Sequence, residues 1–390
     1  MGTDTLANVH VQAASAALGR GEPVEAARHF QTAIQGGLDD PAVWIGLATA
    51  RRGAGDLAGA GEALDAALKR DPQNMIALIH RGDLFVALGD GRAAMAFYNQ
   101  ALRTAEQYEG LPAPLLAEIN RAREACQKQS DKFYGHLAAE LGRAGYDAAS
   151  SSARFTHSLE LLTGQKTPYL QKPRAHFFPE LPQKQFYARD EFPWFDRLEA
   201  AVEDICGELQ ALIDSGSAEF SPYIQASPDR PVDHSMALLD SDDWSSCYLV
   251  RNGEPVEAVV ARCPKTMAAL EDVPLAQIKG RTPSILFSRL LPGAKIPPHH
   301  GFINSRLICH LPLIVPPGCK LRVGNDVREW ERGKGWVFDD TIEHEAWNGS
   351  DASRIILIFD IWRPELTDEE CQLVAALMEA VDGYESGAVR

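Results

Sequence analysis

The chain has 390 residues, 45% of them hydrophobic and 24% charged, which suits two or three globular domains with their own cores. The formal charge of -16 and the lack of a strongly basic run exclude a nucleic acid partner, because phosphate binding needs clustered Lys and Arg. The N-terminus lacks the basic start and apolar core of a secretory signal, and the sequence has no apolar run of about eighteen residues. We therefore expect a cytoplasmic protein without a membrane partner.

Cysteine usage points to the same compartment. Seven cysteines are scattered along the chain without a CxxC pair. An odd number in a chain of this length favours reduced thiols over a disulfide framework. We therefore expect the thiols to be free and mostly buried.

The first hundred residues contain an internal repeat with a period of 34 residues. Four sets of positions align at this period: Gly21, Gly55 and Gly89; Ala26, Ala60 and Ala94; Phe30, Leu64 and Tyr98; Ala33, Ala67 and Ala101. This pattern resembles the tetratricopeptide repeat, a helix pair with a turn glycine, small residues at the helix crossing and a large apolar residue. The resemblance implies a helical array that either binds an extended peptide or only supports its neighbour.

Residues 105–130 keep helical apolar spacing after a proline-containing break, and we interpret them as a helix that caps the array. This predicts a repeat domain of three repeats plus the capping helix over residues 1–130 and a second domain over residues 131–390.

The second domain starts with a helical pattern that runs to about residue 162. A stretch rich in proline and aromatic residues follows, TPYLQKPRAHFFPELPQKQFYARDEFPWF, and favours extended segments. A further helix is indicated from Phe195 to Leu212. The acidic segment DSDDW, residues 240–244, is interpreted as an exposed loop rather than a metal site.

Beyond Arg281 the sequence changes to short apolar runs separated by Gly and Pro: SILFSRLLPG, RLICHLPLIVPPG, CKLRVG, GWVFDD and RIILIFDIW. Such runs are typical of the strands of a sandwich or barrel. Alternate residues of a strand share a face, which groups Arg354, Ile356, Ile358 and Asp360 on one face and Arg306, Ile308 and His310 on another. Because a buried guanidinium is costly without a partner, Arg354 predicts either a protein carboxylate or an anionic ligand.

His299, His344 and Arg354 form the set that a non-haem iron oxygenase needs. The two imidazoles, 45 positions apart, would hold Fe(II) and leave open coordination positions, and the guanidinium would grip a dicarboxylate. A lone histidine on an apolar strand is more often a core residue than a ligand. The joint occurrence of two such histidines with Arg354 favours the metal.

About the last 110 residues resemble the aspartyl/asparaginyl β-hydroxylase family of iron(II)- and 2-oxoglutarate-dependent oxygenases. The resemblance rests on PPHHGFINSRLICHLPLIVPPGC, VREWERGKGWVFDDTIEHEAWN and SRIILIFDIWRPELT, which agree with the family in order and spacing. Members of that family often carry tetratricopeptide repeats in front of the catalytic domain. The resemblance implies a double-stranded β-helix, or jelly-roll, oxygenase domain with flanking helices, and so a multidomain α + β protein.

The same resemblance implies the site residues. The metal-binding and catalytic histidines are His299 and His344. Ser288 and Arg354 hold the distal carboxylate of 2-oxoglutarate, and His310 reaches the carboxylate beside the keto group. A planar guanidinium suits this task because it can bind a carboxylate through two charge-assisted hydrogen bonds. The implied cofactors are Fe(II), 2-oxoglutarate as co-substrate, and O2.

Two positions set this chain apart from related oxygenases. Most of them carry a carboxylate two residues after the first histidine, where this chain has Gly301. The hydroxylase family also lacks this carboxylate, so water is expected to complete the coordination of the metal. Some family members carry an arginine at the position of Ile308. In those members the arginine lies next to the carboxylate beside the keto group. We expect Arg306, on the same strand face as Ile308, or His310 alone to make this contact instead.

Two further polar positions stay open at this stage. Asp340, four residues before His344, either orients a metal-bound water or lies in an exposed turn. His300 is expected on the face opposite to the metal site. The remaining histidines, His234 among them, are interpreted as structural.

The sequence therefore predicts a dioxygenase that hydroxylates a carbon of a protein or peptide, at the β-carbon of Asp or Asn, with the repeats helping to hold the substrate. Three alternatives remain. One is a related hydroxylase of a lipid acyl chain or small molecule, and one is a halogenase, which also lacks the carboxylate. The third is a non-catalytic repeat scaffold, which the intact His299, His344 and Arg354 disfavour.

Overall fold

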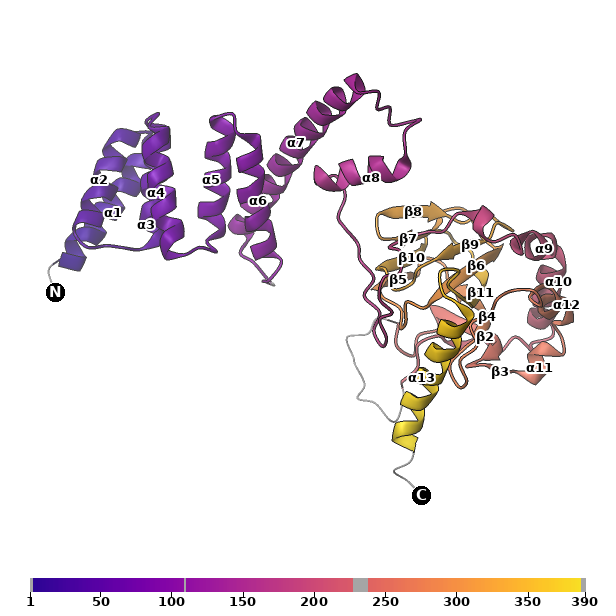
Figure 1. Cartoon of the computed structure of the whole chain (residues 1–390). Coiled ribbons are helices and arrows are strands. Elements are labelled where there is room, and N and C mark those ends of the chain that lie inside the picture. Colours follow the sequence, from indigo (N-terminus) through magenta and orange to yellow (C-terminus); the bar gives the residue numbers. More distant parts are fainter. Residues whose placement is uncertain (1–2, 109, 227–237, 387–390) are drawn as a thin grey trace. The chain divides into compact units, whose positions relative to one another are not determined.

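The computed structural model describes residues 3–108, 110–226 and 238–386 (Figure 1), so His234 lies outside the described residues. The chain forms two compact units, Met1–Thr167 and Pro168–Arg390. The boundary predicted at residue 130 falls inside helix α7 (Ala113–Arg143). Ser130 is buried there and its hydroxyl donates to the carbonyl of Thr163, so the segment after residue 130 packs with the helical unit.

The first unit is entirely helical in its described elements. They are α1 (Thr3–Gly19), α2 (Pro23–Gln35), α3 (Pro41–Gly53), α4 (Leu57–Arg70), α5 (Met75–Ala87), α6 (Gly91–Ala105), α7 and α8 (Ala153–Leu162). Helices α1 to α6 pack as three successive pairs, and α7 packs on α6. This is the predicted array with a capping helix, although α7 is longer than the sequence indicated.

The repeat positions behave alike in all three pairs. The turn glycines Gly21, Gly55 and Gly89 have φ angles of 75°, 83° and 82°, a left-handed conformation that glycine adopts without a steric penalty. The small residues at the helix crossing and the large apolar residues are buried in every repeat. The predicted repeat and its 34-residue register are confirmed.

The second unit is rich in β-structure. Its strands are β1 (Ser221–Pro222), β2 (Trp244–Arg251), β3 (Glu254–Pro255), β4 (Ile285–Leu290), β5 (Lys295–His299), β6 (Arg306–Ile314), β7 (Cys319–Val323), β8 (Asp326–Glu329), β9 (Trp336–Phe338), β10 (His344–Asn348) and β11 (Arg354–Trp362). One sheet has the order β1-β2-β4-β11-β6-β9, with β3 on β2, and the other has the order β5-β10-β7-β8. All of these pairings are antiparallel, and each of the five predicted apolar runs contains a strand.

Short helices cover the outer face of the larger sheet (Figure 1). They are η1 (Arg189–Glu191), α9 (Phe195–Ala200), α10 (Val202–Asp214), α11 (Glu257–Val260) and α12 (Pro264–Ala269). The single helix predicted from Phe195 to Leu212 is thus two helices, which meet at Ala201. Leu307 and Cys309 of β6 pack with these helices, so the alternate residues of β6 face the second sheet.

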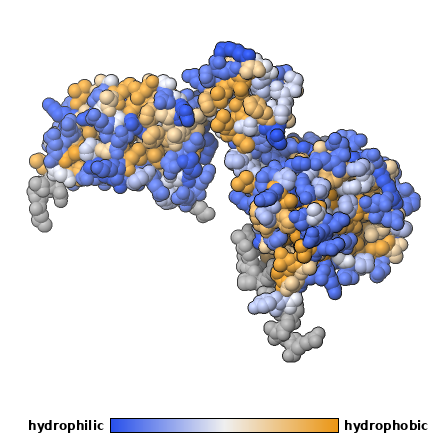
Figure 2. Space-filling view, viewed as in Figure 1, coloured by the Kyte–Doolittle hydropathy of each residue, from blue (hydrophilic) through white to orange (hydrophobic). Residues whose placement is uncertain are grey.

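The last described helix, α13 (Asp368–Ser386), rests on this unit through Val374 and Met378, which pack with Ile278 and Ile303. Figure 2 shows hydrophobic residues gathered along α13, where Leu373 is 60% exposed. All seven cysteines are free and five of them are buried, as predicted. Among the helices of the described segments, none has the length and hydrophobicity to cross a bilayer.

Candidate active site

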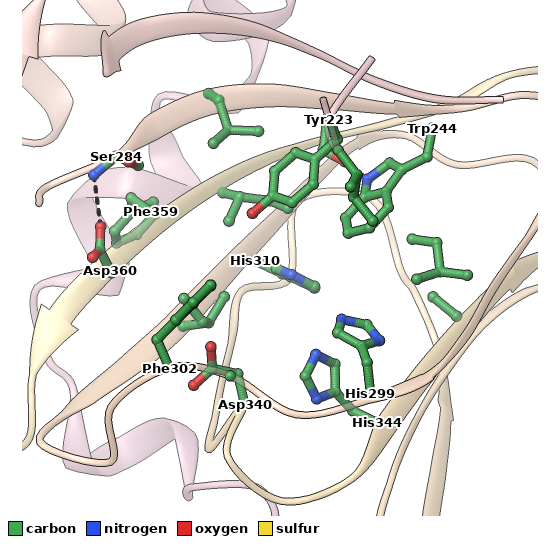
Figure 3. A pocket seen from close by; sticks show the side chains of 18 of the residues that line it. Tyr223, Trp244, Ser284, His299, Phe302, His310, Asp340, His344, Phe359 and Asp360 are labelled. Atoms are coloured by element: carbon green, nitrogen blue, oxygen red, sulfur yellow. Dashed lines mark hydrogen bonds between the residues drawn. The ribbon is translucent and has the colours of Figure 1, made fainter. Parts of the chain in front are cut away.

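A cavity of about 800 Å³ lies between the two sheets of the second unit (Figure 3). Its walls come from β2, β4, β6 and β11 of the larger sheet and from β5, β7 and β10 of the smaller one. All six predicted site residues line it: His299, His344, Ser288, His310, Arg354 and Arg306. Residues from five separate strands thus meet in one space.

The two histidines face each other because their strands pair. His299 ends β5 and His344 begins β10, and the two are direct cross-strand partners with ring centroids 4.0 Å apart. Each Nδ1 lies on a backbone carbonyl, that of Pro297 at 2.8 Å and that of Ile342 at 3.0 Å. A carbonyl only accepts, so each Nδ1 donates and each neutral ring keeps its lone pair on Nε2. Burial lowers the pKa of both imidazoles, which favours this neutral form.

A buried cation lies elsewhere on the cavity wall. The Arg354 side chain is only 1% exposed, stacks over the Trp330 ring at 4.9 Å, and leaves its Nε and Nη1 without hydrogen-bond partners. No carboxylate of the described residues pairs with it. Burial lowers the pKa of Arg354 to about 10, so it stays charged at neutral pH. Ser288 is its diagonal neighbour on β4 and accepts a hydrogen bond from the Trp244 indole at 3.1 Å.

His310 adds a neutral imidazole to the same cavity. Its ring lies edge-on to Phe338 with centroids 4.8 Å apart, and its buried Nδ1 has no hydrogen-bond partner. Burial, together with the positive charge of Arg354, lowers the pKa of His310 well below its ordinary value. An unpaired buried nitrogen of this kind is available to a ligand.

Asp340 is buried at 6% exposure, so its alternative placement in an exposed turn was wrong. Burial raises its pKa to about 6, although the nearby Arg306 acts in the opposite direction. The Gly301 amide donates to the Asp340 carbonyl at 2.6 Å, and a Cβ on Gly301 would lie 2.2 Å from the Asp340 carboxyl carbon. The carboxyl of Asp340 therefore occupies the space that a side chain at position 301 would need.

The sequence did not single out two aromatic residues of the site. Trp244, placed in the acidic loop, instead opens β2 and stacks on Tyr223 with centroids 4.0 Å apart. The apolar run WSSCYLV that begins at Trp244 was the available signal. His300 borders the cavity rather than facing away, because β5 ends at His299 and strict alternation ends with it. In the part of the chain that the structure describes, no three His, Cys, Asp or Glu side chains gather closely enough to hold an ion.

Comparisons with known proteins agree with this geometry. Residues 199–364 match the model of the aspartyl/asparaginyl beta-hydroxylase family. This match covers most of the second unit. Residues 11–74 and 45–109 match the tetratricopeptide repeat model, which covers the helix pairs of the first unit. These matches confirm the resemblance found in the sequence, and a hydroxylase domain supports an enzyme.

Three relatives show how far the likeness extends. The mouse aspartyl/asparaginyl beta-hydroxylase is 39% identical over 36% of this chain and 19% of its own length. The ornithine lipid ester-linked acyl 2-hydroxylase of Rhizobium tropici is 34% identical over 48% of this chain and 63% of its own length. The human aspartate beta-hydroxylase domain-containing protein 2 is 30% identical over 53% of this chain and 54% of its own length. The chain thus spans less than two thirds of each relative.

Proposed function

We propose that the second unit is an Fe(II)- and 2-oxoglutarate-dependent dioxygenase that hydroxylates a carbon of a protein or peptide substrate, at the β-carbon of Asp or Asn. One observation carries this proposal: a single cavity holds two facing neutral imidazoles and a buried guanidinium without a partner. Imidazole lone pairs suit a divalent metal, and an unpaired buried cation suits a carboxylate. When bound, Fe(II), 2-oxoglutarate and O2 supply the oxidising power that turns C–H into C–OH.

The chain's own residues position these groups. The carbonyls of Pro297 and Ile342 fix both imidazole rings with Nε2 free, so these two nitrogens would hold the metal. Arg354 and Ser288 orient the distal carboxylate of 2-oxoglutarate, and the Trp244 indole holds the Ser288 hydroxyl in place.

Other residues of the cavity bind the second carboxylate of 2-oxoglutarate, orient water or exclude it. His310, neutral and unpaired, reaches the carboxylate beside the keto group. Asp340, whose carboxyl lies beside Gly301, would orient a water in the site once the metal is bound. The isoleucines of β6 and β11 keep bulk water from the reacting carbon. The helical repeats help to hold the substrate chain.

The neighbourhood of Gly301 argues against a halogenase. A halide would need the coordination position that the missing carboxylate leaves open. Here the Asp340 carboxyl fills the space beside Gly301, and its negative charge disfavours a second anion there.

A second candidate function is hydroxylation of an acyl chain. Ile308, Ile356 and Ile358 give the cavity an apolar wall, and a relative that shares 34% identity is named as a lipid acyl hydroxylase. Products identified by mass spectrometry, from peptide and from phospholipid or ornithine lipid substrates, separate the two candidates.

The proposed dioxygenase is tested with the purified full chain. Anaerobic addition of Fe(II) and 2-oxoglutarate should give a weak visible charge-transfer band, and admission of air should yield succinate. His299→Ala and His344→Ala should each abolish both signals, because either change removes one of two protein ligands. His136→Ala, an exposed position on α7, is the matched control. A folded protein without band or succinate would instead favour a non-catalytic scaffold.

A further inference from the structure

Among the charged groups of the cavity, one arginine is already shared by two carboxylates. The Arg306 guanidinium lies 3.4 Å from a carboxylate oxygen of Asp340 and 3.4 Å from one of Asp360. All three side chains are largely buried. This cluster therefore presents a net negative charge to the cavity before any substrate enters.

The remaining cations of the wall are also committed. Among the described residues, the cavity is bordered by four arginines: Arg174, Arg281, Arg306 and Arg354. Arg281 pairs with both oxygens of Asp382, and Arg354 is the group assigned to the co-substrate. Arg174 is exposed and its guanidinium stacks over the Phe302 ring at 4.8 Å, so solvent weakens the effect of its charge on the cavity without removing it.

Ile308 occupies the central position on this wall. On β6 it lies directly across from Asp360 of β11 and from Phe338 of β9, on the same face as Arg306. A cation here would face the two carboxylates and the space in front of the histidine pair. The isoleucine leaves that place apolar.

With the metal and 2-oxoglutarate bound, the charges of the cavity would then sum to zero before a substrate enters. A divalent metal offsets the two negative charges of 2-oxoglutarate, and Arg354 and Arg306 offset Asp340 and Asp360. A substrate carboxylate would add a buried anion with no partner, which is strongly unfavourable.

A carboxamide would add no charge and would bring hydrogen-bond donors. The cluster has room for such donors, because Asp340 Oδ1 is buried and accepts no hydrogen bond, and Asp360 Oδ2 has only the ion pair with Arg306 at 3.4 Å.

We propose that the side chain hydroxylated in this cavity is that of asparagine and not aspartate, with the Asp360 and Asp340 carboxylates accepting from its NH2 group and Ile308 withholding the cation that a carboxylate would need. This inference rests on the proposed dioxygenase and narrows its substrate. Ile308 and Asp360 are the residues that set the choice.

The test uses the full chain with Fe(II) and 2-oxoglutarate and two peptide libraries with random flanks, identical except for a central Asn or Asp. Hydroxylated peptides are counted by mass spectrometry while succinate is measured in parallel. The Asn library should be modified at least about tenfold more than the Asp library, as is typical where a site is built around a hydrogen-bonding group. Retention of both libraries on immobilised metal-free protein saturated with 2-oxoglutarate, so that Arg354 is occupied, gives a second readout, and Asn peptides should be enriched there too.

Two variants each raise the net charge of the cavity by one unit, in different ways. Ile308→Arg introduces a cation, and Asp360→Asn removes a carboxylate while keeping the oxygen that accepts from the Ser284 amide at 2.8 Å. Each should shift the Asn-to-Asp ratio towards Asp by about tenfold or more, in turnover and in retention. Ile308→Met, which changes shape without charge, should leave the ratio unchanged.

The outcomes separate this inference from the function on which it rests. Equal or better modification of the Asp library, or an unchanged ratio in both charge variants when they are folded, would overturn the preference for asparagine. Succinate formation with no peptide modified, for example with a phospholipid or ornithine lipid as the true acceptor, would overturn it and leave the dioxygenase intact. No succinate under any condition would remove the dioxygenase itself.

Discussion

The carboxyl of Asp340 is held in an environment that opposes its charge. Burial between Gly301 and Arg306 raises its pKa from 3.8 to about 6. Between these values the folded protein binds a proton more readily than the unfolded chain does. The stability of the native state therefore falls as pH rises from about 4 through 6, and the full penalty is present above that range.

Replacing Asp340 by Asn should accordingly stabilise the metal-free protein at neutral pH. A shift of about two pKa units corresponds to roughly 1 to 3 kcal/mol of unfolding free energy above pH 6.5, and the gain should vanish near pH 4. Urea unfolding of wild type and variant at both pH values measures the difference. Asp351→Asn, at an exposed position before β11, should change the free energy little at either pH. A gain that does not depend on pH would show that charge burial is not its source.

The residues that the sequence could predict were those on regular strands. Alternation on β6 and β11 places Arg306, His310 and Arg354 on the cavity wall, and the resemblance supplied their proposed roles. The burial of Asp340 and the cavity position of Trp244 could not be predicted in this way. Both follow from which distant strands and loops meet, and a single sequence does not give that information.

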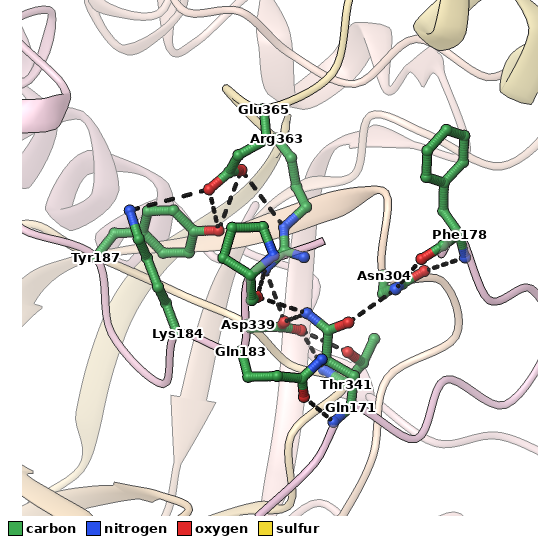
Figure 4. Close-up of polar contacts among 11 residues, drawn as sticks. Gln171, Phe178, Gln183, Lys184, Tyr187, Asn304, Asp339, Thr341, Arg363 and Glu365 are labelled. Atoms are coloured by element: carbon green, nitrogen blue, oxygen red, sulfur yellow. Dashed lines mark hydrogen bonds and ion pairs between the residues drawn. The ribbon is translucent and has the colours of Figure 1, made fainter. Parts of the chain in front are cut away.

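At the scale of elements, the extended segment before α9 is joined to the sheets by a buried polar network (Figure 4). The Asp339 carboxylate accepts from Arg363 at 2.8 Å, from Gln171 at 2.6 Å, and from the backbone and hydroxyl of Thr341. The side chains of Asp339 and Arg363 are both fully buried. The proline content predicted an extended segment, but not the residues to which it would bind.

Removal of one member of this buried ion pair should destabilise the second unit strongly. Asp339→Ala leaves the Arg363 charge without its carboxylate, and we expect a loss of about 3 to 5 kcal/mol of unfolding free energy. Gln171→Ala keeps the ion pair and removes only amide hydrogen bonds, so it should cost about 1 to 3 kcal/mol. Urea unfolding followed by tryptophan fluorescence compares the two. Equal losses would mean that the ion pair adds nothing beyond the amide contacts.

The helices show where local patterns were sufficient and where packing overrode them. The repeat helices were predictable because the same small and large residues recur in each pair. The capping helix was predicted to end at residue 130, yet α7 continues to Arg143, and Ser130 is buried where its hydroxyl donates to Thr163. In the second unit, the helical pattern ran through Ala201 although the chain forms two helices there.

At the scale of the whole molecule, the described residues of each unit form hydrophobic core clusters. All of the proposed catalytic groups lie in Pro168–Arg390. The repeat unit can therefore affect turnover of a substrate that both units bind, without contributing to the chemistry. Such a tethered arrangement raises the local concentration of substrate at the cavity.

A chain consisting of residues 168–390 should consequently form succinate from 2-oxoglutarate as the full chain does in the absence of substrate. Its kcat/KM for a protein substrate should fall by about ten- to a hundredfold, mainly through KM, because the tether is lost. Adding residues 1–167 as a separate chain should not restore the value, since the gain depends on the covalent link. An unchanged kcat/KM would show that the repeats bind something other than the substrate. A truncation that starts at residue 131 is the informative comparison, because it cuts α7 and removes Ser130, whose hydroxyl donates to the carbonyl of Thr163.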